Sequence, residues 1–219
     1  MSTFRFYYGI GACSFAPHVA LEEAGADFEP VLVALGENEQ CTPEYRRINP
    51  KGRVPALARG DWVLTEVPAI LRYVALTHPA AKLWPTAPEL DARCAEWLAW
   101  LSSTVHPAYS HISRSERYVS TPAGREEAVV KGRENCRELC LDIERRIGRG
   151  PWALGEDYSV ADPYLLVVWT WGRLVGSTTL AVGLDPEREL PNWTAHARRM
   201  TARPAVRRAI EREGLRFPW

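Results

Sequence analysis

Cys13 is the residue best placed to do chemistry, because it follows the apolar run at 4–8 and the glycine turn GIGA at 9–12. A helical pattern begins directly after it, so free backbone amides and the positive end of a helix dipole meet at its thiol. Such surroundings lower the pKa of a thiol and favour the nucleophilic thiolate. We therefore interpret Cys13 as reactive, against the alternative of a buried apolar cysteine. Ser14 could donate a hydroxyl to the same point, or simply cap the helix.

Two further segments offer groups that suit a peptide-like ligand. In RVPAL the Val54–Pro55 bond lies between a loop and a strand, where a cis bond costs little. A tight turn there frees the backbone amide and carbonyl of Val54 to pair with an extended ligand. Glu66 lies where a strand meets a helix start, so it could hold an ammonium group while the amide of Val67 holds a carboxylate. Complementarity to the helix dipole is the alternative explanation of Glu66.

Aromatic residues could complete the site. Tyr7 and Tyr8 end the first apolar run, and neighbours on a strand point to opposite faces, so one could reach the site while the other packs. Seven of the nine tryptophans lie after residue 89, where they could line a cleft or fill a helical core. Our candidates for an apolar pocket are Trp100, His106, Tyr109 and Trp169.

The elements that must position these residues differ between the two halves of the chain. Residues 1–83 read as strand, helix, strand, a short loop helix, two strands and a helix, which predicts a mixed four-stranded sheet of the thioredoxin-like kind. Pro30 favours an edge position for the second strand. The expected strands are 4–8, 28–35, 54–59 and 61–66, and the expected helices are 14–25, 44–48 and 67–78.

Residues 90–219 show helical periodicity almost throughout, and the proline-rich stretch 84–89 is the predicted linker. The expected helices are 90–119, 123–148, 160–176, 192–201 and 204–213. In DYSVAD, Ser159 and Asp162 have the spacing of a capping box that begins a helix. The predicted fold class is α+β, with a thioredoxin-like N-terminal domain followed by an all-α helical-bundle domain.

Composition excludes several classes of protein. The 219 residues carry 27 basic and 27 acidic side chains, which argues against nucleic acid or an anionic membrane as partner. No apolar run is long enough to span a membrane, and the start does not resemble a signal peptide, so we expect a cytoplasmic protein. Five scattered cysteines without a CxxC pair predict neither a disulfide framework nor a metal site.

Five segments together resemble the glutathione transferase superfamily, most closely its bacterial beta class. They are YYGIGACSFAPHVALEEAG (7–25), NPKGRVPAL (49–57), LTEVPAILRYVA (64–75), the YSVAD capping box and MTARPAVRRAI (200–210). The resemblance implies an N-terminal domain that binds glutathione and a helical domain that holds a small hydrophobic electrophile. It also implies a homodimer.

The resemblance also implies roles for single residues. Cys13 looks like the beta-class cysteine that lies against the glutathione sulfur and can form a mixed disulfide with it, with Tyr8 close by. Val54, before a cis Pro55, would pair with the cysteinyl part of glutathione, and Glu66 would contact the γ-glutamyl end. His106 falls where the beta class has a histidine near the second substrate.

The chain departs from the family pattern at three positions. Val67 stands where Ser or Thr usually binds the γ-glutamyl carboxylate, Ala99 stands where an asparagine is common, and the loop GENEQ lacks a family lysine. Losing the hydroxyl leaves one donor fewer, and no cationic residue is evident locally to replace it. The expected function is glutathione transfer or thiol exchange. The alternative is a non-catalytic binding or regulatory protein of the same fold, while a dithiol oxidoreductase would need a second cysteine.

Overall fold

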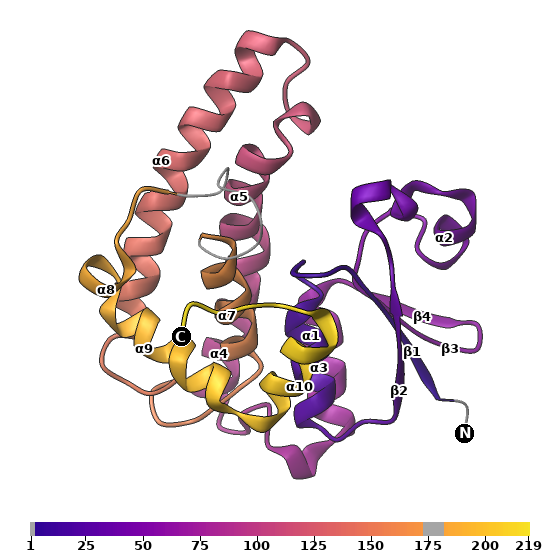
Figure 1. Cartoon of the computed structure of the whole chain (residues 1–219). Coiled ribbons are helices and arrows are strands. Elements are labelled where there is room, and N and C mark those ends of the chain that lie inside the picture. The colour runs from indigo at the N-terminus through magenta and orange to yellow at the C-terminus, as the bar shows by residue number, and fades with distance from the viewer. Residues whose placement is uncertain (1–2, 173–181) are drawn as a thin grey trace.

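The computed structural model describes residues 3–172 and 182–219, and its N-terminal part is built on a four-stranded sheet in the order β2–β1–β3–β4 (Figure 1). Strand β1 (Phe4–Tyr8) pairs in parallel with β2 (Phe28–Leu32) and antiparallel with β3 (Ala56–Arg59). Strand β4 (Trp62–Thr65) completes the antiparallel side. Pro30 lies in the edge strand β2, where a missing amide costs least. The mixed sheet confirms the predicted thioredoxin-like plan.

Helices cover both faces of the sheet. Helices α1 (Phe15–Glu23) and α3 (Val67–Thr77) pack on one face, together with the side chains of Phe6 and Tyr8. Helix α2 (Pro43–Ile48) covers the other face, where Tyr7 and Tyr45 meet edge to face at 6.0 Å between ring centroids. The side chains of successive β1 residues therefore pack into two separate cores, because neighbours on a strand point to opposite faces.

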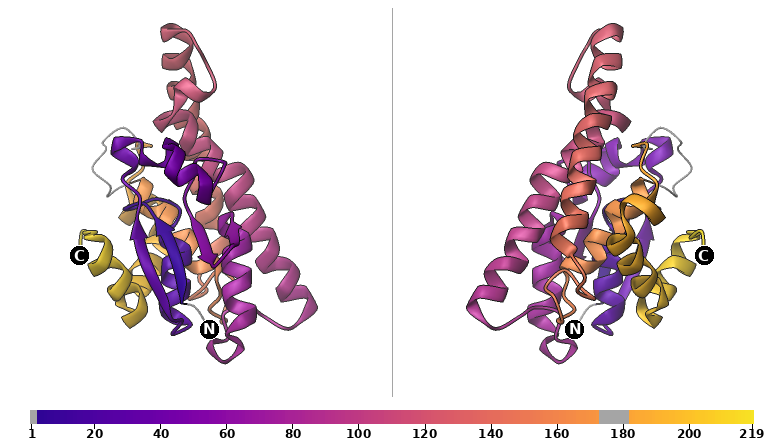
Figure 2. Two further views of the ribbon diagram at one scale, coloured as in Figure 1. Left: turned by 90° about the vertical axis from the view of Figure 1, so that its right-hand side faces the viewer. Right: turned by 90° about the vertical axis from the view of Figure 1, so that its left-hand side faces the viewer.

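The rest of the chain is mainly helical, which confirms the predicted fold class. Figures 1 and 2 show the paired ends of α5 and α6 projecting beyond the remaining elements. Five of its described helices begin with proline, whose missing amide is tolerated at the first helical position. The helices are α4 (Pro88–Trp100), α5 (His106–Ser113), α6 (Pro122–Ile147), α7 (Ala161–Trp171), α8 (Pro186–Glu189), α9 (Pro191–Ala202) and α10 (Pro204–Glu213), with short 3₁₀ turns at Leu35–Glu37, Glu39–Cys41, Pro79–Ala81 and Ser115–Arg117.

Two predicted helices differ from the observed ones. The single helix expected over 90–119 is wrong, because a π-helical turn at Leu101–Val105 separates α4 from α5. Pro107 lies in the first turn of α5, and without an amide it cannot continue the α-helical hydrogen bonds of α4. His106 is thereby placed at the start of a new helix. The helix expected over 160–176 is observed as far as Trp171, and its predicted end lies outside the described residues.

Helix α1 joins the two halves of the molecule. It packs against α3 on the sheet side and against α7 and α10 on the other, which brings indigo and yellow segments together in Figure 1. Arg203 pairs with Glu23 at 2.5 Å, and Arg208 and Arg212 both pair with Glu22. The turn that precedes α1, which carries Cys13, therefore lies at the junction of the sheet and the helices. The division into domains 1–83 and 90–219 stays a prediction.

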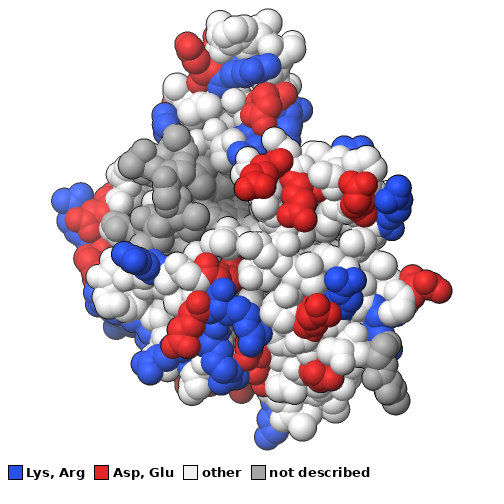
Figure 3. All heavy atoms as spheres, turned by 45° about the vertical axis from the view of Figure 1, so that its right-hand side comes forward, with Lys and Arg blue, Asp and Glu red and all other residues white. Residues whose placement is uncertain are grey.

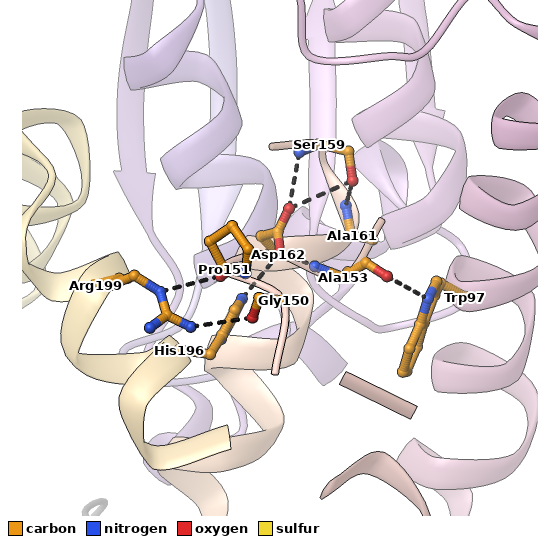
Figure 4. Close-up of polar contacts among 9 residues, drawn as sticks. All are labelled: Trp97, Gly150, Pro151, Ala153, Ser159, Ala161, Asp162, His196 and Arg199. Atoms are coloured by element: carbon orange, nitrogen blue, oxygen red, sulfur yellow. Dashed lines mark hydrogen bonds and ion pairs between the residues drawn. The ribbon is translucent and has the colours of Figure 1, made fainter. Parts of the chain in front are cut away.

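The Asp162 carboxylate anchors the start of α7 (Figure 4). Its Oδ2 accepts the amide of Ser159 at 2.8 Å, which confirms the reciprocal half of the capping box, and Oδ1 accepts the amide of Ala153 at 2.7 Å. His196 Nε2 donates to the same carboxylate at 2.9 Å from helix α9. Asp162 and its three partners are buried. The Asp162 side chain therefore connects the loop before α7 with helix α9.

Acidic and basic side chains alternate over the face of the molecule in Figure 3, and neither sign forms a continuous field there. Among the described residues, no helix is long and apolar enough to cross a membrane. The same residues contain no cluster of three or more His, Cys, Asp or Glu side chains that could hold a metal ion.

Candidate functional site

Cys13 lies at the point where two cavities meet. It follows the Gly9–Ala12 turn, in which Gly11 has a positive φ of 63° that glycine adopts freely. The side chain is almost buried, and its Sγ donates to the carbonyl oxygen of Val54 at 3.5 Å. The Val54–Pro55 bond is cis, as expected from the sequence. The thiol and the Val54 backbone therefore lie within contact of each other before any ligand binds.

The environment of Cys13 contradicts the expected thiolate. Burial raises the pKa of this thiol to about 12, and hydrogen bonds from its own amide and that of Ser14 lower it by less. The amides at the start of α1 favour the thiolate, as expected from the sequence. The loss of water around the sulfur disfavours it and has the larger effect. In the free protein, Cys13 is consequently a neutral thiol at pH 7.

The first cavity, of about 590 Å³, lies beside the sheet and contains the four predicted glutathione-binding residues. We call it the sheet-side cavity; Cys13, Val54, Pro55, Glu66 and Val67 all line it. Within the described chain the amide of Val54 donates no hydrogen bond. The two residues that flank the start of α3 therefore share one cavity with the thiol and the Val54 backbone.

The start of α3 differs in one respect from the expectation. Lys51 Nζ lies 2.6 Å from Glu66 Oε1 and 2.9 Å from the hydroxyl of Thr65. The expectation that no cationic residue lies near Val67 is therefore wrong. Lys51 belongs to the NPKG motif, and only the fold brings it to a glutamate fifteen residues later in the chain. Glu66 itself has a φ of 73°, a strained value for a residue other than glycine. Strained backbone of this kind is often found at binding sites.

The second cavity, of about 530 Å³, lies between the turn at Cys13 and the helices. We call it the helix-side cavity; His106 and Tyr109 line it, as predicted, and so does Trp171. Burial, together with the positive charges of Arg117 and Arg53, lowers the pKa of His106 to about 4. Its Nδ1 lies 3.4 Å from the hydroxyl of Tyr164. His106 is therefore neutral at pH 7 and lines both cavities.

Known proteins resemble this chain over nearly its whole length. Residues 2–76 match the family model described as the N-terminal domain of glutathione S-transferase. The glutathione S-transferase GstA of Escherichia coli O157:H7 is 31% identical over 97% of this chain and 100% of its own length. The chain belongs to the glutathione S-transferase family.

Solved structures extend the similarity to the whole fold. A glutathione transferase homologue from Sulfitobacter, solved with bound glutathione, is 38% identical and has a TM-score of 0.89 over 99% of this chain and 100% of its own. The bacterial beta-class glutathione S-transferase of Sphingomonas chungbukensis is 32% identical, with a TM-score of 0.80 over 96% and 98%. The resemblance noted in the sequence is thus confirmed at the level of the family and the fold.

Four predicted residues of this transferase-family chain line neither cavity. The ring of Tyr8 stacks on Phe6 in the core beside α1, and Ser14 holds the turn through Gly9, whose amide and carbonyl both lie 3.1 Å from its hydroxyl. Arg146 covers the ring of Trp100 in a separate cavity. Trp169 packs against the C-terminal segment, with its ring 4.9 Å from that of Trp219.

The residue two places beyond Trp169 is the tryptophan that reaches the site. Trp171 Nε1 donates to the carbonyl of Gly11 at 3.0 Å, and its ring lies 4.7 Å from that of His106. The amide of Gly11 donates to Glu213 Oε2 at 2.9 Å, from the end of α10. The amide and the carbonyl of Gly11 therefore both form hydrogen bonds with the helical part of the transferase fold. These two bonds hold the Cys13 turn in place. Periodicity alone does not tell which of two nearby tryptophans faces this turn.

Proposed function

We propose that this protein conjugates glutathione to a small hydrophobic electrophile, with Cys13 beside the glutathione sulfur. The observation that carries the proposal is the contact between the Cys13 thiol and the Val54 carbonyl at the border of the two cavities. A peptide-like substrate in the sheet-side cavity and an electrophile in the helix-side cavity would meet at that sulfur. The bound glutathione of the Sulfitobacter homologue supports the choice of substrate.

Glutathione would lie along the sheet-side cavity. Its cysteinyl residue would pair with the amide and carbonyl of Val54, as a short added strand does. Its γ-glutamyl ammonium would meet Glu66, and its carboxylate would meet the amide of Val67 and the ammonium of Lys51. The Lys51 ammonium then donates to this carboxylate in place of the hydroxyl that position 67 lacks.

The neutral Cys13 thiol acts as a hydrogen-bond donor in this proposal. Pairing of glutathione with Val54 takes over the carbonyl that now accepts from Cys13, which frees the S–H group for the glutathione sulfur. A donor aimed at a sulfur anion favours the glutathione thiolate. The proton of glutathione passes to solvent, because His106 with a pKa of about 4 is too weak a base to hold it at pH 7.

The chemical step then forms one bond and breaks another. The glutathione thiolate attacks the electrophilic carbon, a carbon–sulfur bond forms, and the leaving group departs with the electron pair of its bond to carbon. The products are a thioether, the anionic leaving group and the proton released earlier. Bringing both reactants to one sulfur lowers the entropic barrier, which is a principal contribution a binding cleft can make.

Thiol exchange is the other reaction that the site could support. In exchange, the Cys13 thiolate would attack a glutathione disulfide, form a mixed disulfide and release one glutathione as its thiolate. The buried thiol disfavours this route, because a pKa of about 12 leaves very little thiolate at pH 7. Conjugation needs only the neutral thiol and is therefore our first choice.

Two variants distinguish these reactions. Cys13→Ser keeps a donor of similar size but cannot form a disulfide, whereas Cys13→Ala removes the donor. With chlorodinitrobenzene as electrophile we expect nearly the wild-type rate for Cys13→Ser and a loss of about tenfold for Cys13→Ala, the equivalent of one hydrogen bond. Equal rates in all three proteins would contradict the donor role. With a glutathione mixed disulfide as substrate, activity of the wild-type protein that both variants lose would favour covalent exchange.

The non-catalytic alternative has its own signature. A wild-type protein that binds glutathione in calorimetry but conjugates no electrophile would support a binding or regulatory role. A protein that does neither would leave the family fold without the family ligand and would overturn the proposal.

A further inference from the structure

Arginine side chains gather at the helix-side cavity and carry charge that the mechanism above does not use. Arg53 reaches it from the loop before β3, Arg114 from the end of α5 and Arg117 from the following 3₁₀ turn. Among the described residues, no Asp or Glu lines this cavity. Over residues 3–172 and 182–219, none of the three arginines forms an ion pair; Arg53 and Arg114 instead contact backbone carbonyls at 3.5 and 2.9 Å.

The positive charges of Arg53 and Arg114 both act on the guanidinium group of Arg117. Burial and the charges of Arg53 and Arg114 lower the pKa of Arg117. Glu116 offsets part of this repulsion but does not line the cavity, and Glu66 lines the other cavity, where it pairs with Lys51. An anion between the arginines would therefore gain charge-assisted hydrogen bonds and remove a repulsion at the same time.

Much of the remaining wall of the helix-side cavity is apolar, although Gln40, Ser110 and Ser113 also line it. Ile10 and Leu35 line it on the sheet side, and Tyr109, Ile112 and Trp171 line it on the helix side. A volume of about 530 Å³ lies within the range of cavities that enclose small organic ligands. Shape and polarity therefore suit a molecule with an apolar, ring-sized body and one charged end.

Resting on the proposed function, we propose that the second substrate is an aromatic electrophile that carries a carboxylate, held by Arg114 and Arg117 while its ring contacts Trp171. Arg53 and Arg117 line both cavities, so either could also meet the glycyl carboxylate of glutathione. Arg114 lines the helix-side cavity but not the sheet-side one. It is consequently the residue that separates recognition of the second substrate from recognition of glutathione.

The test compares two electrophiles that differ only in charge. Chloronitrobenzoate and chloronitrobenzamide share the ring, the nitro group and the chloride that leaves. We expect the ratio of kcat/KM for the benzoate to that for the benzamide to fall about tenfold in Arg114→Gln, since one charge-assisted hydrogen bond is lost. Arg149→Gln is the matched control: it removes the same charge from an exposed arginine that lines neither cavity, and the ratio should stay at the wild-type value.

Two outcomes would overturn the inference while the proposed function stands. One is conjugation of both electrophiles with a ratio that Arg114→Gln leaves unchanged. The other is a rise in the KM for glutathione in Arg114→Gln without a change in the ratio, which would assign the arginines to the glycyl carboxylate.

A binding experiment separates this inference from failure of the proposed function. Naphthoate and naphthamide cannot be conjugated, so calorimetry with them reports only on the cavity. Tighter binding of naphthoate that Arg114→Gln weakens about tenfold would support an anion site even in a protein without transferase activity. Equal binding of both compounds to the wild-type protein would overturn the inference.

Discussion

At the level of single residues, the state of Cys13 decides what the site can do. A cysteine at the start of a helix receives stabilisation from backbone amides, but here the thiol has lost its water, and burial dominates. The same sulfur that cannot ionise readily can still donate a hydrogen bond, as its contact with the Val54 carbonyl shows. Its neutral state therefore favours a donor role and disfavours a nucleophilic one.

The neutral thiol leads to a prediction about alkylation. Cys41 is exposed, whereas Cys13, Cys94, Cys136 and Cys140 are buried, so iodoacetamide at pH 7 should label Cys41 first. This order differs from the sequence-based prediction, in which Cys13 is the reactive cysteine and is alkylated first. Because the pKa of Cys13 is raised to about 12, its slow labelling should accelerate about tenfold for each unit of pH above 7. Peptide mass spectrometry measures both rates.

The control for alkylation is Cys41→Ser, which should remove the fast phase and leave the slow one. Labelling of Cys13 before Cys41 at pH 7 would show that the thiol ionises far more readily than its burial implies.

Val67 is the second residue with a measurable effect. Its side chain lines the sheet-side cavity at the start of α3, where the family has Ser or Thr. Val67→Thr adds a hydroxyl with almost no change of shape, and we expect glutathione to bind about tenfold more tightly through a hydrogen bond to its carboxylate. Isothermal calorimetry gives the affinity directly. Val67→Ala, which removes methyl groups without adding a donor, should not tighten binding; equal affinities of both variants would place the γ-glutamyl end elsewhere.

At the level of elements, sequence patterns predicted the fold more completely than the site. Alternating and helical periodicities predicted every strand of the sheet, since each strand carries apolar side chains that pack into or against a core. The π-helical turn at Leu101–Val105 was missed, because apolar spacing continues through it and only Pro107 marks the break. That turn lies directly before His106, so the missed element affects the placement of a candidate site residue.

The capping network of α7 allows a prediction about stability. Asp162 is fully buried and accepts hydrogen bonds from Ala153, Ser159 and His196. Asp162→Ala would leave these donors without an acceptor, and we expect a loss of about 3–5 kcal/mol in the free energy of unfolding. Urea denaturation followed by circular dichroism measures it. Asp142→Ala is the control, because it removes two partly exposed ion pairs on α6 and should cost less than about 1 kcal/mol. Similar losses in the two variants would contradict the network.

At the level of the whole molecule, the candidate site exists because two halves of the chain meet. Cys13, Val54 and Glu66 could be identified from local motifs, since each lies at a turn or helix start that sequence patterns reveal. Trp171, Arg114 and Arg117 could not, because their place at the cavity beside the Cys13 turn depends on how the helices pack against the sheet. Lys51 belongs to the same group, as its partner Glu66 is near only in the folded structure.

The assembly of the whole molecule is also open to test. The family resemblance implies a homodimer that joins the N-terminal part of one chain to the helical part of the other, and exposed apolar side chains such as Trp62 and Leu76 are available for contacts. Stable interfaces of this kind commonly bury more than about 2,000 Å². Light scattering at micromolar concentration should therefore give twice 24.7 kDa. A monomer mass that persists at higher concentration would contradict the dimer.

The central claim is that glutathione binds in the sheet-side cavity with its sulfur beside Cys13, and a crystal structure with glutathione tests it most directly. The account predicts that the cysteinyl backbone pairs with the amide and carbonyl of Val54, that the γ-glutamyl group lies between Glu66 and Val67, and that the nearest protein sulfur is Sγ of Cys13. Glutathione bound with its sulfur away from Cys13, or absent from the cavity at saturating concentration, would contradict the account.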